Sequence, residues 1–246
     1  MIYRDQLKTP SIHLINDDYK NRINLISELG NVIIVTDPPF NIGYHYKEYN
    51  DNMIEDDYFA MLVDIINKFP TVIIHYPEAL HRLSVKSGVV PEKIVSWVYN
   101  SNTAKQHRDI AWYRVKPIFT NAWQPYKNEN DKRIKNLIAN GSKGGRMYDW
   151  WNVNQVKNTN KEKTAHPCQM PVDVMKNIIS TLPENSIIFD PFMGSGTTAV
   201  ACIELGYDFV GCEIDSTYYN ITKNRINSFG DICYINGCCK TAWKLL

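Results

Sequence analysis

Four consecutive residues, Asp37-Pro38-Pro39-Phe40, combine groups that could bind a planar amine. They follow the apolar run Val32 to Val35, which is typical of a buried strand, and ligands in open α/β sheets bind beyond the carboxyl ends of strands. Both prolines fix φ and lack an N–H, so the chain leaves the strand stiffly. A carboxylate, a free carbonyl and a flat ring suit the exocyclic amine of a base. The alternative is an ordinary Asp-Pro turn with a core phenylalanine.

A second loop, Asp190-Pro-Phe-Met-Gly-Ser-Gly-Thr-Thr-Ala199, lies between an expected strand and an expected helix. Gly194 and Gly196 let the backbone turn tightly and let a ligand approach closely. Their spacing fits a dinucleotide fingerprint, and Glu213 closes the next strand 17 residues after Gly196. An acid there accepts both ribose hydroxyls of an adenosine. The pattern indicates NAD or another adenosine cofactor, and a plain helix-capping turn beside a surface glutamate is the alternative.

The two loops together resemble the beta group of DNA amino-methyltransferases, which methylate N6 of adenine or N4 of cytosine with S-adenosylmethionine (SAM). Asp37 to Phe40 is similar to the family's catalytic motif, and Asp190 to Gly196 is similar to its cofactor loop. The catalytic motif comes first, which is the circularly permuted order of this group. His166-Pro167-Cys-Gln-Met-Pro171 resembles the segment that precedes the cofactor loop, and Asn16-Asp17 resembles a Gly-Asp near the cofactor adenine.

The resemblance spans about residues 12 to 228, and two positions depart from the family pattern. Met170 stands where the family commonly has lysine, and Asn16 replaces the usual glycine. Either change could weaken the affinity for the cofactor, so an inactive DNA-binding remnant is one alternative.

The resemblance implies that a flipped-out base attacks the sulfonium methyl directly, without a covalent enzyme intermediate. Asp37 and the Pro38 carbonyl would accept the hydrogen bonds of the amine, and Phe40 would stack on the base. Tyr44 and Tyr46 are candidates to wall the pocket, with aromatic core packing as the alternative role for at least one of them. The catalytic residues expected are Asp37, Pro38, Pro39 and Phe40. The cofactor-binding residues expected are Asp17, Asp37, His166, Pro167, Asp190, Pro191, Phe192, Gly194, Ser195, Gly196, Thr197, Thr198 and Glu213.

The resemblance favours adenine-N6 methylation of double-stranded DNA, because the first motif position is aspartate. Many cytosine-N4 members resemble Ser-Pro-Pro instead, so N4-cytosine methylation is the nearest alternative. An NAD-dependent oxidoreductase is a further alternative, which leaves Asp37 to Phe40 unexplained. RNA as the substrate is not distinguished by the sequence.

The order of apolar runs and turn signals predicts strands that alternate with helices. Alternation of this kind predicts the α/β class, with a mostly parallel sheet and helices on both faces, and the resemblance makes it a Rossmann-like methyltransferase fold. Strands are expected at 12–15, 31–36, 71–76, 94–99, 110–113, 115–119, 186–189 and 208–212. Helices are expected at 19–29, 55–68, 77–86, 172–182, 197–205 and 218–227.

The segment 120–165 interrupts this alternation and carries nine lysines or arginines against four acids. We interpret it as an inserted target-recognition region of a single methyltransferase domain that spans residues 1–246. Lys132, Arg133, Lys143 and Arg146 are expected to contact DNA phosphates. A solvated loop with an incidental charge excess is the alternative. The region is small, so we expect either a short recognition site or help from a second subunit, and hence a homodimer.

The composition narrows the cellular setting. Of 246 residues, 44% are apolar and 22% are charged, which is ordinary for a globular chain, and the formal net charge of +1 argues against a general nucleic-acid coat protein. No apolar run spans a bilayer and no secretory signal is visible, so we expect a cytoplasmic protein of a prokaryotic or phage-infected cell, nucleoid-associated while it works. The six cysteines include no C-x-x-C pair, so we expect free thiols and no metal.

Overall fold

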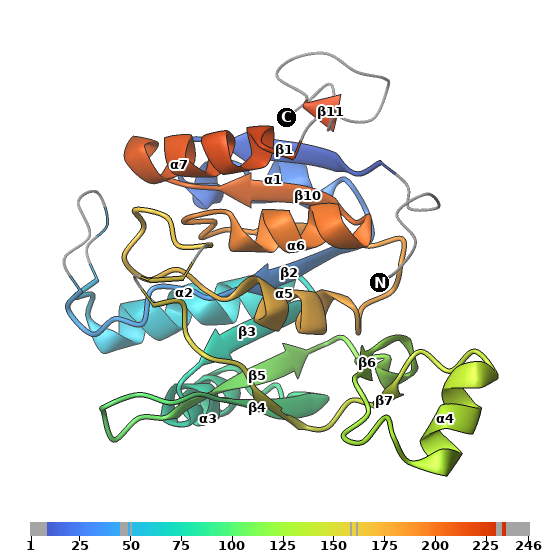
Figure 1. Cartoon of the computed structure of the whole chain (residues 1–246). Helices are drawn as coiled ribbons and strands as arrows, with labels where there is room; N and C mark the ends of the chain where they lie inside the picture. Colours follow the sequence, from blue (N-terminus) through green and yellow to red (C-terminus); the bar gives the residue numbers. More distant parts are fainter. Residues whose placement is uncertain are drawn as a thin grey trace.

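The computed structural model describes residues 9–44, 49, 51–157, 159–160, 162–229 and 233–234. Its centre is a nine-stranded sheet in the order β11-β1-β10-β9-β2-β3-β5-β4-β8 (Figure 1). The strands are β1 (Ser11–Ile15), β2 (Val32–Thr36), β3 (Thr71–His75), β4 (Lys93–Val98), β5 (His107–Tyr113), β8 (Trp150–Asn152), β9 (Ile187–Asp190), β10 (Asp208–Cys212) and β11 (Cys233–Tyr234). Within this sheet only β5 is antiparallel to its neighbours. The expected mostly parallel sheet is therefore confirmed.

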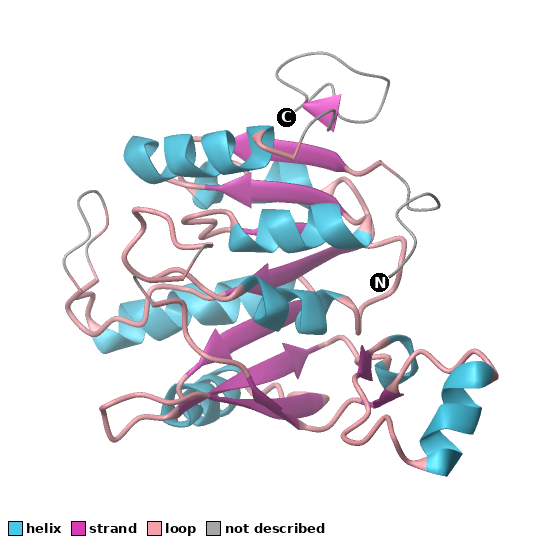
Figure 2. Ribbon diagram, in the orientation of Figure 1, coloured by secondary structure: helices cyan, strands magenta, loops and turns pink. Residues whose placement is uncertain are grey.

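Helices cover both faces of the sheet, as expected (Figure 2). The short helix η2 (Tyr19–Asn21) and helices α1 (Ile23–Ser27), α2 (Glu55–Lys68) and α3 (Pro77–Ser87) share one apolar cluster with the sheet. Helices α5 (Val172–Ile179), α6 (Thr197–Leu205) and α7 (Ser216–Asn227) share the other. Strands β2 and β3 are buried along their whole length, which explains why their sequences are continuous apolar runs rather than alternating ones.

The strand order reverses between β2 and β9, and this reversal positions the site. From β2 the chain continues to β3 on one side, whereas β9 leads to β10 and β1 on the other. Neighbouring parallel strands with diverging connections leave a crevice at their carboxyl ends. The loop that follows Thr36 and the loop that follows Asp190 both begin at that crevice.

The expected strand Val115 to Phe119 is wrong. β5 ends at Tyr113 because Arg114 adopts a positive φ of 58°, and the chain continues as a loop to the short helix η3 (Phe119–Asn121). The hairpin partner of β5 is β4, with Val98 opposite His107. The expected helix at 19–29 is also broken, into η2 and the five-residue α1.

The segment 120–165 is partly built into the main sheet. Its strand β8 pairs in parallel with β4, and the indole N–H of Trp97 donates to the Val153 carbonyl at 2.7 Å. Trp151 is buried against Trp112. Residues 123–146, with strands β6 (Trp123–Gln124) and β7 (Gly145–Arg146) and helix α4 (Lys132–Ala139), project from one end of the sheet (Figure 1).

In the part of the chain that the structure describes, no helix combines the length and the apolar character needed to cross a membrane.

Two adjacent tryptophans test whether β8 is part of the core. Trp151 is 4% exposed, whereas Trp150 is 48% exposed and stacks on Tyr148. We expect Trp151→Ala to lower the free energy of unfolding by about 3–5 kcal/mol, because it leaves a large cavity. Trp150→Ala should cost about 1 kcal/mol or less. Urea denaturation of both variants measures this, and equal losses would show that β8 is not packed as described.

Candidate active site

A cavity of about 380 Å³ lies at the carboxyl ends of β2, β9 and β10. All four residues from Asp37 to Phe40 line it. Twelve of the thirteen residues expected to bind the cofactor line it as well: Asp17, Asp37, His166, Pro167, Asp190, Pro191, Phe192, Gly194, Ser195, Thr197, Thr198 and Glu213. Gly196 is not among the lining residues. The fold thus brings together two loops that are about 150 residues apart in the chain.

The buried carboxylate of Asp190 joins these two loops. It accepts hydrogen bonds from the Thr36 hydroxyl at 2.8 Å, from the Thr198 hydroxyl at 2.6 Å and from the Phe192 backbone N–H at 3.1 Å. Burial raises the pKa of Asp190 to about 6, and the two hydroxyls oppose that rise. The carboxylate is committed to the protein, so Asp190 shapes the cavity wall through its hydrogen bonds.

Asp37, unlike Asp190, keeps a carboxylate oxygen available to a ligand. Its Oδ1 atom is buried without a hydrogen-bond partner among the described residues, and its Oδ2 lies 3.9 Å from Nη1 of Arg108. Burial raises the pKa of Asp37 to about 7, with Arg108 lowering it and Asp190 raising it further. An acceptor that has lost water and has no internal donor favours a ligand that supplies an N–H.

A buried relay supports the loop behind Asp37. The Tyr76 backbone N–H donates to Nδ1 of His75 at 2.7 Å, so the proton of the neutral ring is on Nε2. Nε2 lies 2.8 Å from the Tyr58 hydroxyl, which donates to the Pro39 carbonyl at 2.8 Å. Burial lowers the pKa of His75 to about 3, so the ring stays neutral. This network holds the Pro39 carbonyl, and it leaves the Pro38 carbonyl out.

The ring of Phe40 lies inside an aromatic cluster. Its centroid is 4.6 Å from that of His75 and 5.1 Å from that of Tyr76. The guanidinium carbon of Arg108 lies 4.6 Å above the ring. Sequence reasoning missed Arg108, His75 and Tyr58, because each comes from an element that is distant from the motif in the chain.

The segment after Phe40 is tied back by a second buried carboxylate, Asp51, which sequence reasoning also missed. Its oxygens accept from the backbone N–H groups of Asn41 at 2.9 Å, Ile42 at 3.2 Å and Tyr44 at 2.9 Å. Three backbone donors on one carboxylate fix the start of this loop beside the cavity, which Tyr44 lines as expected. Tyr46 lies outside the described residues.

Packing explains both glycines of the second loop. Gly194 has a φ of +54°, and a Cβ there would lie 3.1 Å from Nε2 of His166. Gly196 has a φ of +72°, and its Cβ would lie 2.5 Å from the side chain of Thr222. Positive φ angles and close neighbours together require glycine at both positions. Gly196 therefore shapes the turn without lining the cavity.

Glu213 is locked to the glycine loop. Its carboxylate accepts from the backbone N–H of Gly194 at 2.8 Å and from that of Asp215 at 2.8 Å. Burial raises the pKa of Glu213 to about 7, and the two backbone N–H groups oppose the rise. Each carboxylate oxygen has a further lone pair, so the group can still accept from a ligand.

The remaining loop hydroxyls have partners within the protein. The Thr197 hydroxyl donates to the Met170 carbonyl at 3.2 Å and lies 3.3 Å from the Ser195 hydroxyl. Arg225 of α7 donates to the Ser195 carbonyl at 3.1 Å. These contacts attach the segment that carries Met170 and the helix α7 to the glycine loop.

The two departures from the family pattern have structural roles. The Asn16 side-chain amide donates to the Glu213 carbonyl at 2.8 Å, which joins the ends of β1 and β10. Met170 is buried, and its sulfur lies 3.5 Å from Nη1 of Arg108. Asp17 accepts from the Asn21 amide at 2.8 Å and pairs with Arg22 at 2.9 Å.

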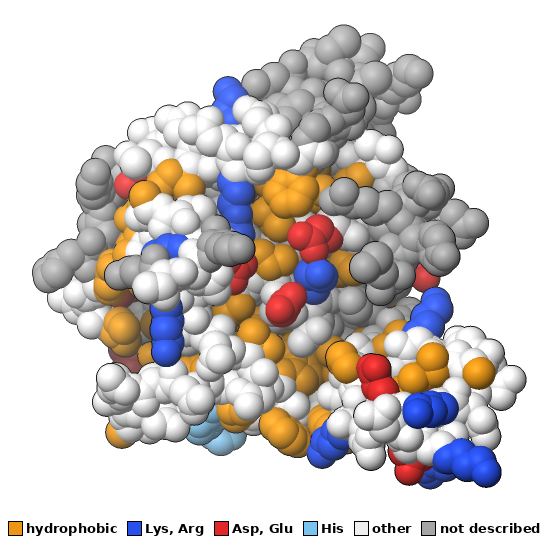
Figure 3. Space-filling model, in the orientation of Figure 1, with side chains coloured by type: hydrophobic (Ala, Val, Ile, Leu, Met, Phe, Trp, Pro, Cys, Tyr) orange, Lys and Arg blue, Asp and Glu red, His pale blue; other side chains and the backbone are white. Residues whose placement is uncertain are grey.

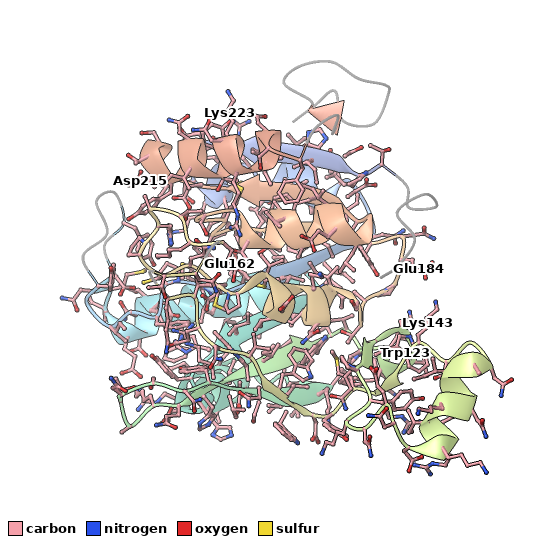
Figure 4. The ribbon with its side chains drawn as sticks, in the orientation of Figure 1. Trp123, Lys143, Glu162, Glu184, Asp215 and Lys223 are labelled. Carbon is pink, nitrogen blue, oxygen red and sulfur yellow. The ribbon has the colours of Figure 1, made fainter. Side chains whose placement is uncertain are left out.

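The four residues expected to contact DNA do not line the cavity. Lys132 and Arg133 lie on α4, Arg146 lies on β7, and Lys143 lies between these elements. β5 ends opposite Thr71, the first residue of β3. The chain therefore leaves the sheet at the amino-terminal ends of the parallel strands, opposite to the cavity. Figure 3 shows the lysines and arginines that gather over α4, and Figure 4 shows Lys143 at the opposite end from Asp215, which lines the cavity.

Among the residues that the structure describes, no group of three or more histidine, cysteine, aspartate or glutamate side chains is arranged to hold a metal ion.

Comparison with known proteins adds a family to this geometry. The model of a family named N6_N4_Mtase and described as DNA methylase matches residues 72–224. The Type II methyltransferase M.BglII of Bacillus subtilis is 27% identical over 251 residues, covering 88% of this chain and 69% of that protein. The DNA adenine methyltransferase YhdJ of Escherichia coli K12 is 25% identical over 224 residues, covering 79% of this chain and 76% of that protein.

Solved structures share the fold. A complex of M1.HpyAVI with SAM has a TM-score of 0.59 at 24% identity, covering 88% of this chain and 99% of that one. The cytosine-N4-specific PvuII DNA methyltransferase has a TM-score of 0.60 at 14% identity, covering 94% of this chain and 91% of that one. The expected Rossmann-like methyltransferase fold is confirmed.

Removal of one hydroxyl tests the relay behind the site. Tyr58→Phe leaves the Pro39 carbonyl without its donor, and we expect it to lower the free energy of unfolding by about 1–3 kcal/mol. Tyr126→Phe is the matched control, because its hydroxyl pairs with Ser142 at 2.8 Å on the half-exposed projection. That control should cost less than about 1 kcal/mol. If both variants lose the same free energy of unfolding in urea denaturation, the Tyr58 hydroxyl does not support the loop.

Proposed function

The chain belongs to the N6_N4 family of DNA methylases, and from this premise we propose that it methylates the exocyclic N6 of adenine in double-stranded DNA, with SAM as the methyl donor. The observation that carries the proposal is the Asp37 carboxylate, whose buried Oδ1 has no partner among the described residues, in a cavity that the glycine loop also lines. A base inside a duplex cannot reach such a cavity, so the target base is flipped out.

The residues beside the glycine loop fit SAM. Nδ1 of His166 and Oδ2 of Asp215 are buried without hydrogen-bond partners among the described residues, and both side chains line the cavity. One donor-or-acceptor ring and one carboxylate suit a ligand with amino, carboxylate and hydroxyl groups. Glu213 would hold the ribose, and Asp17 would lie near the adenine. The other residues that would line the SAM site are His166, Pro167, Asp190, Pro191, Phe192, Gly194, Ser195, Thr197 and Thr198, with Asp37 beside the methyl, while Gly196 would shape the turn of the loop. When bound, SAM supplies an electrophilic methyl on its sulfonium.

Asp37 orients the amine and stabilises the charge that develops on its nitrogen. Its ionised carboxylate accepts an N–H from the target amine, and the interaction is strong because the carboxylate has lost most of its water. The Pro38 carbonyl is the second acceptor. The Tyr58 hydroxyl holds the Pro39 carbonyl, so the loop needs no rearrangement when the amine arrives.

Adenine is favoured over cytosine by the aspartate at the first position of the motif. The nearest alternative, N4 of cytosine, presents the same kind of amine to the same acceptors. An adenine methyltransferase and a cytosine-N4-specific enzyme both occur among the similar proteins. Membership of a DNA methylase family does not agree with an NAD-dependent oxidoreductase.

The positions of the basic residues lead us to propose a second subunit. Lys132, Arg133, Lys143 and Arg146 lie at the edge of the sheet away from the cavity, so one copy does not present them beside its own target base. A homodimer would let these residues hold the duplex that enters the partner's cavity. Such a protein would work on the nucleoid in the cytoplasm of a prokaryotic or phage-infected cell.

Removal of the Asp37 carboxylate tests the proposed chemistry. We expect Asp37→Ala to lower methyl transfer by at least about 100-fold, because an electrostatic acceptor of this kind contributes that much to catalysis. SAM binding should change little, since the glycine loop is untouched. Incorporation of radiolabelled methyl into DNA measures the transfer, and calorimetry measures the binding.

The control is Asp57→Ala, because Asp57 is exposed in the first turn of α2 and outside the cavity. It should retain the activity of the unmodified protein. Undiminished transfer by Asp37→Ala would remove Asp37 from the mechanism.

Charge reversal tests the DNA interface. We expect reversal of Lys132, Arg133 and Arg146 to weaken DNA binding and to reduce the slope of log K against log salt by about 0.9 for each lost phosphate contact. Reversal of Lys68, Arg82 and Lys86, on helices α2 and α3, is the control. If the slope for the first set equals that of the unmodified protein, the segment is a solvated projection.

A further inference from the structure

Arg108 stands inside the cavity although it belongs to a strand of the sheet. It is the second residue of β5, and its side chain is 16% exposed. The guanidinium carbon lies 4.6 Å above the ring of Phe40 and 5.4 Å from that of Trp97. Nη1 lies 3.9 Å from Oδ2 of Asp37. One cation therefore contacts both groups to which the proposed function assigns the target base.

The guanidinium has the properties that these two groups select in a base. It is planar, it stacks on aromatic faces, and it carries only N–H donors. A flipped base would stack on Phe40 and direct the N–H of its amine at Asp37. Arg108 already makes the first contact and faces the second at 3.9 Å. The base and the guanidinium compete for one position.

Within the part of the chain that the structure describes, the guanidinium of Arg108 lacks a close carboxylate partner. Nε is buried without a partner among the described residues, and Nη1 lies 3.5 Å from the sulfur of Met170, a weak acceptor. A buried guanidinium normally forms a bidentate pair with a carboxylate, and 3.9 Å from Asp37 is too long for a hydrogen bond. The head is thus held by stacking on Phe40 and by the neutral hydroxyls of Tyr76 and Tyr99, and not by a carboxylate pair.

The charge of Arg108 also acts on Asp37. The groups that face Asp37 are Arg108 from β5, Asp190 at the end of β9, Tyr58 from α2 and Tyr99 after β4. Arg108 lowers the pKa of Asp37, whereas burial and Asp190 raise it. Arg108 therefore favours the ionised acceptor before any donor arrives.

We propose that Arg108 is a positioning residue that occupies the target-base subsite in the DNA-free protein, keeps Asp37 ionised there, and is displaced from Phe40 by the incoming base. This inference rests on the proposed function of the site. A residue that instead donated a hydrogen bond to the ring of the base would make the same contacts with Asp37. The two roles predict opposite effects of removing the Arg108 side chain. If Arg108 competes with the base, its removal favours insertion of the base. If Arg108 binds the base, its removal opposes insertion.

The experiment compares Arg108→Ala, Arg108→Lys and the control Arg82→Ala, which lies on the exposed face of α3. The probe is duplex DNA with 2-aminopurine at the position found methylated in product DNA, because its fluorescence rises when it leaves the stack. At pH 8.5 we expect Arg108→Ala to raise the inserted fraction by about threefold or more. A fall of about tenfold, the loss typical of a hydrogen bond from a charged donor, would overturn the proposal.

The pH dependence supplies the readout that a merely structural role would not move. Asp37 is active when ionised, so methyl transfer declines as the pH falls through its pKa. Loss of the cation raises that pKa, and Arg108→Ala should move the acidic limb of the rate profile upward by about one pH unit or more. Arg108→Lys retains the charge and should keep the limb near that of the unmodified protein. Limbs that coincide in all variants would overturn the proposal.

Titration of the DNA-free protein separates this inference from the proposed function. The carboxyl carbon of Asp37, assigned with Asp37→Asn, can be followed by NMR without any activity. A pKa that rises in Arg108→Ala and not in Arg108→Lys supports the pairing even in a protein that transfers no methyl. An unchanged pKa would contradict the pairing whatever the protein methylates.

Discussion

The site depends on one buried carboxylate, Asp190, which joins two strands that are neighbours in the sheet and distant in the chain. Thr36 at the end of β2 and Thr198 in the first turn of α6 both donate to it. Water is excluded there, so loss of the carboxylate would leave two buried hydroxyls without partners. The loop that carries Asp37 and the glycine loop consequently share one wall of one cavity.

The same exclusion of water determines the environment of the Asp37 carboxylate. Asp37 lies beside this wall, loses its hydration and gains no hydrogen bond at Oδ1 from the described residues. Arg108 compensates part of the cost through its charge, and the aromatic cluster around Phe40 keeps the surroundings apolar. On the proposed function, a target amine would donate the hydrogen bond that Oδ1 lacks among the described residues. In that case, binding of the base would also orient the reacting nitrogen.

The sequence predicted what is encoded locally. The buried strand β10 and the helix α2 have the expected bounds, because an apolar run or a helical period between turn signals specifies each of them. β8 was missed, since a three-residue strand exists through its pairing with β4. The positive φ of Arg114 leaves no signal in composition. The motif loops were found for their local patterns, whereas Tyr58, His75 and Arg108 reach the site only through the tertiary fold.

On the proposed function, this cavity transfers a methyl group to an amino nitrogen in DNA. The most direct test is nucleoside mass spectrometry of unmethylated DNA after incubation with the protein and isotopically labelled SAM. We expect the DNA to contain labelled N6-methyladenine. Labelled N4-methylcytosine would keep the chemistry and change the base. If neither product forms although SAM is shown to bind, the proposed methyl transfer is contradicted.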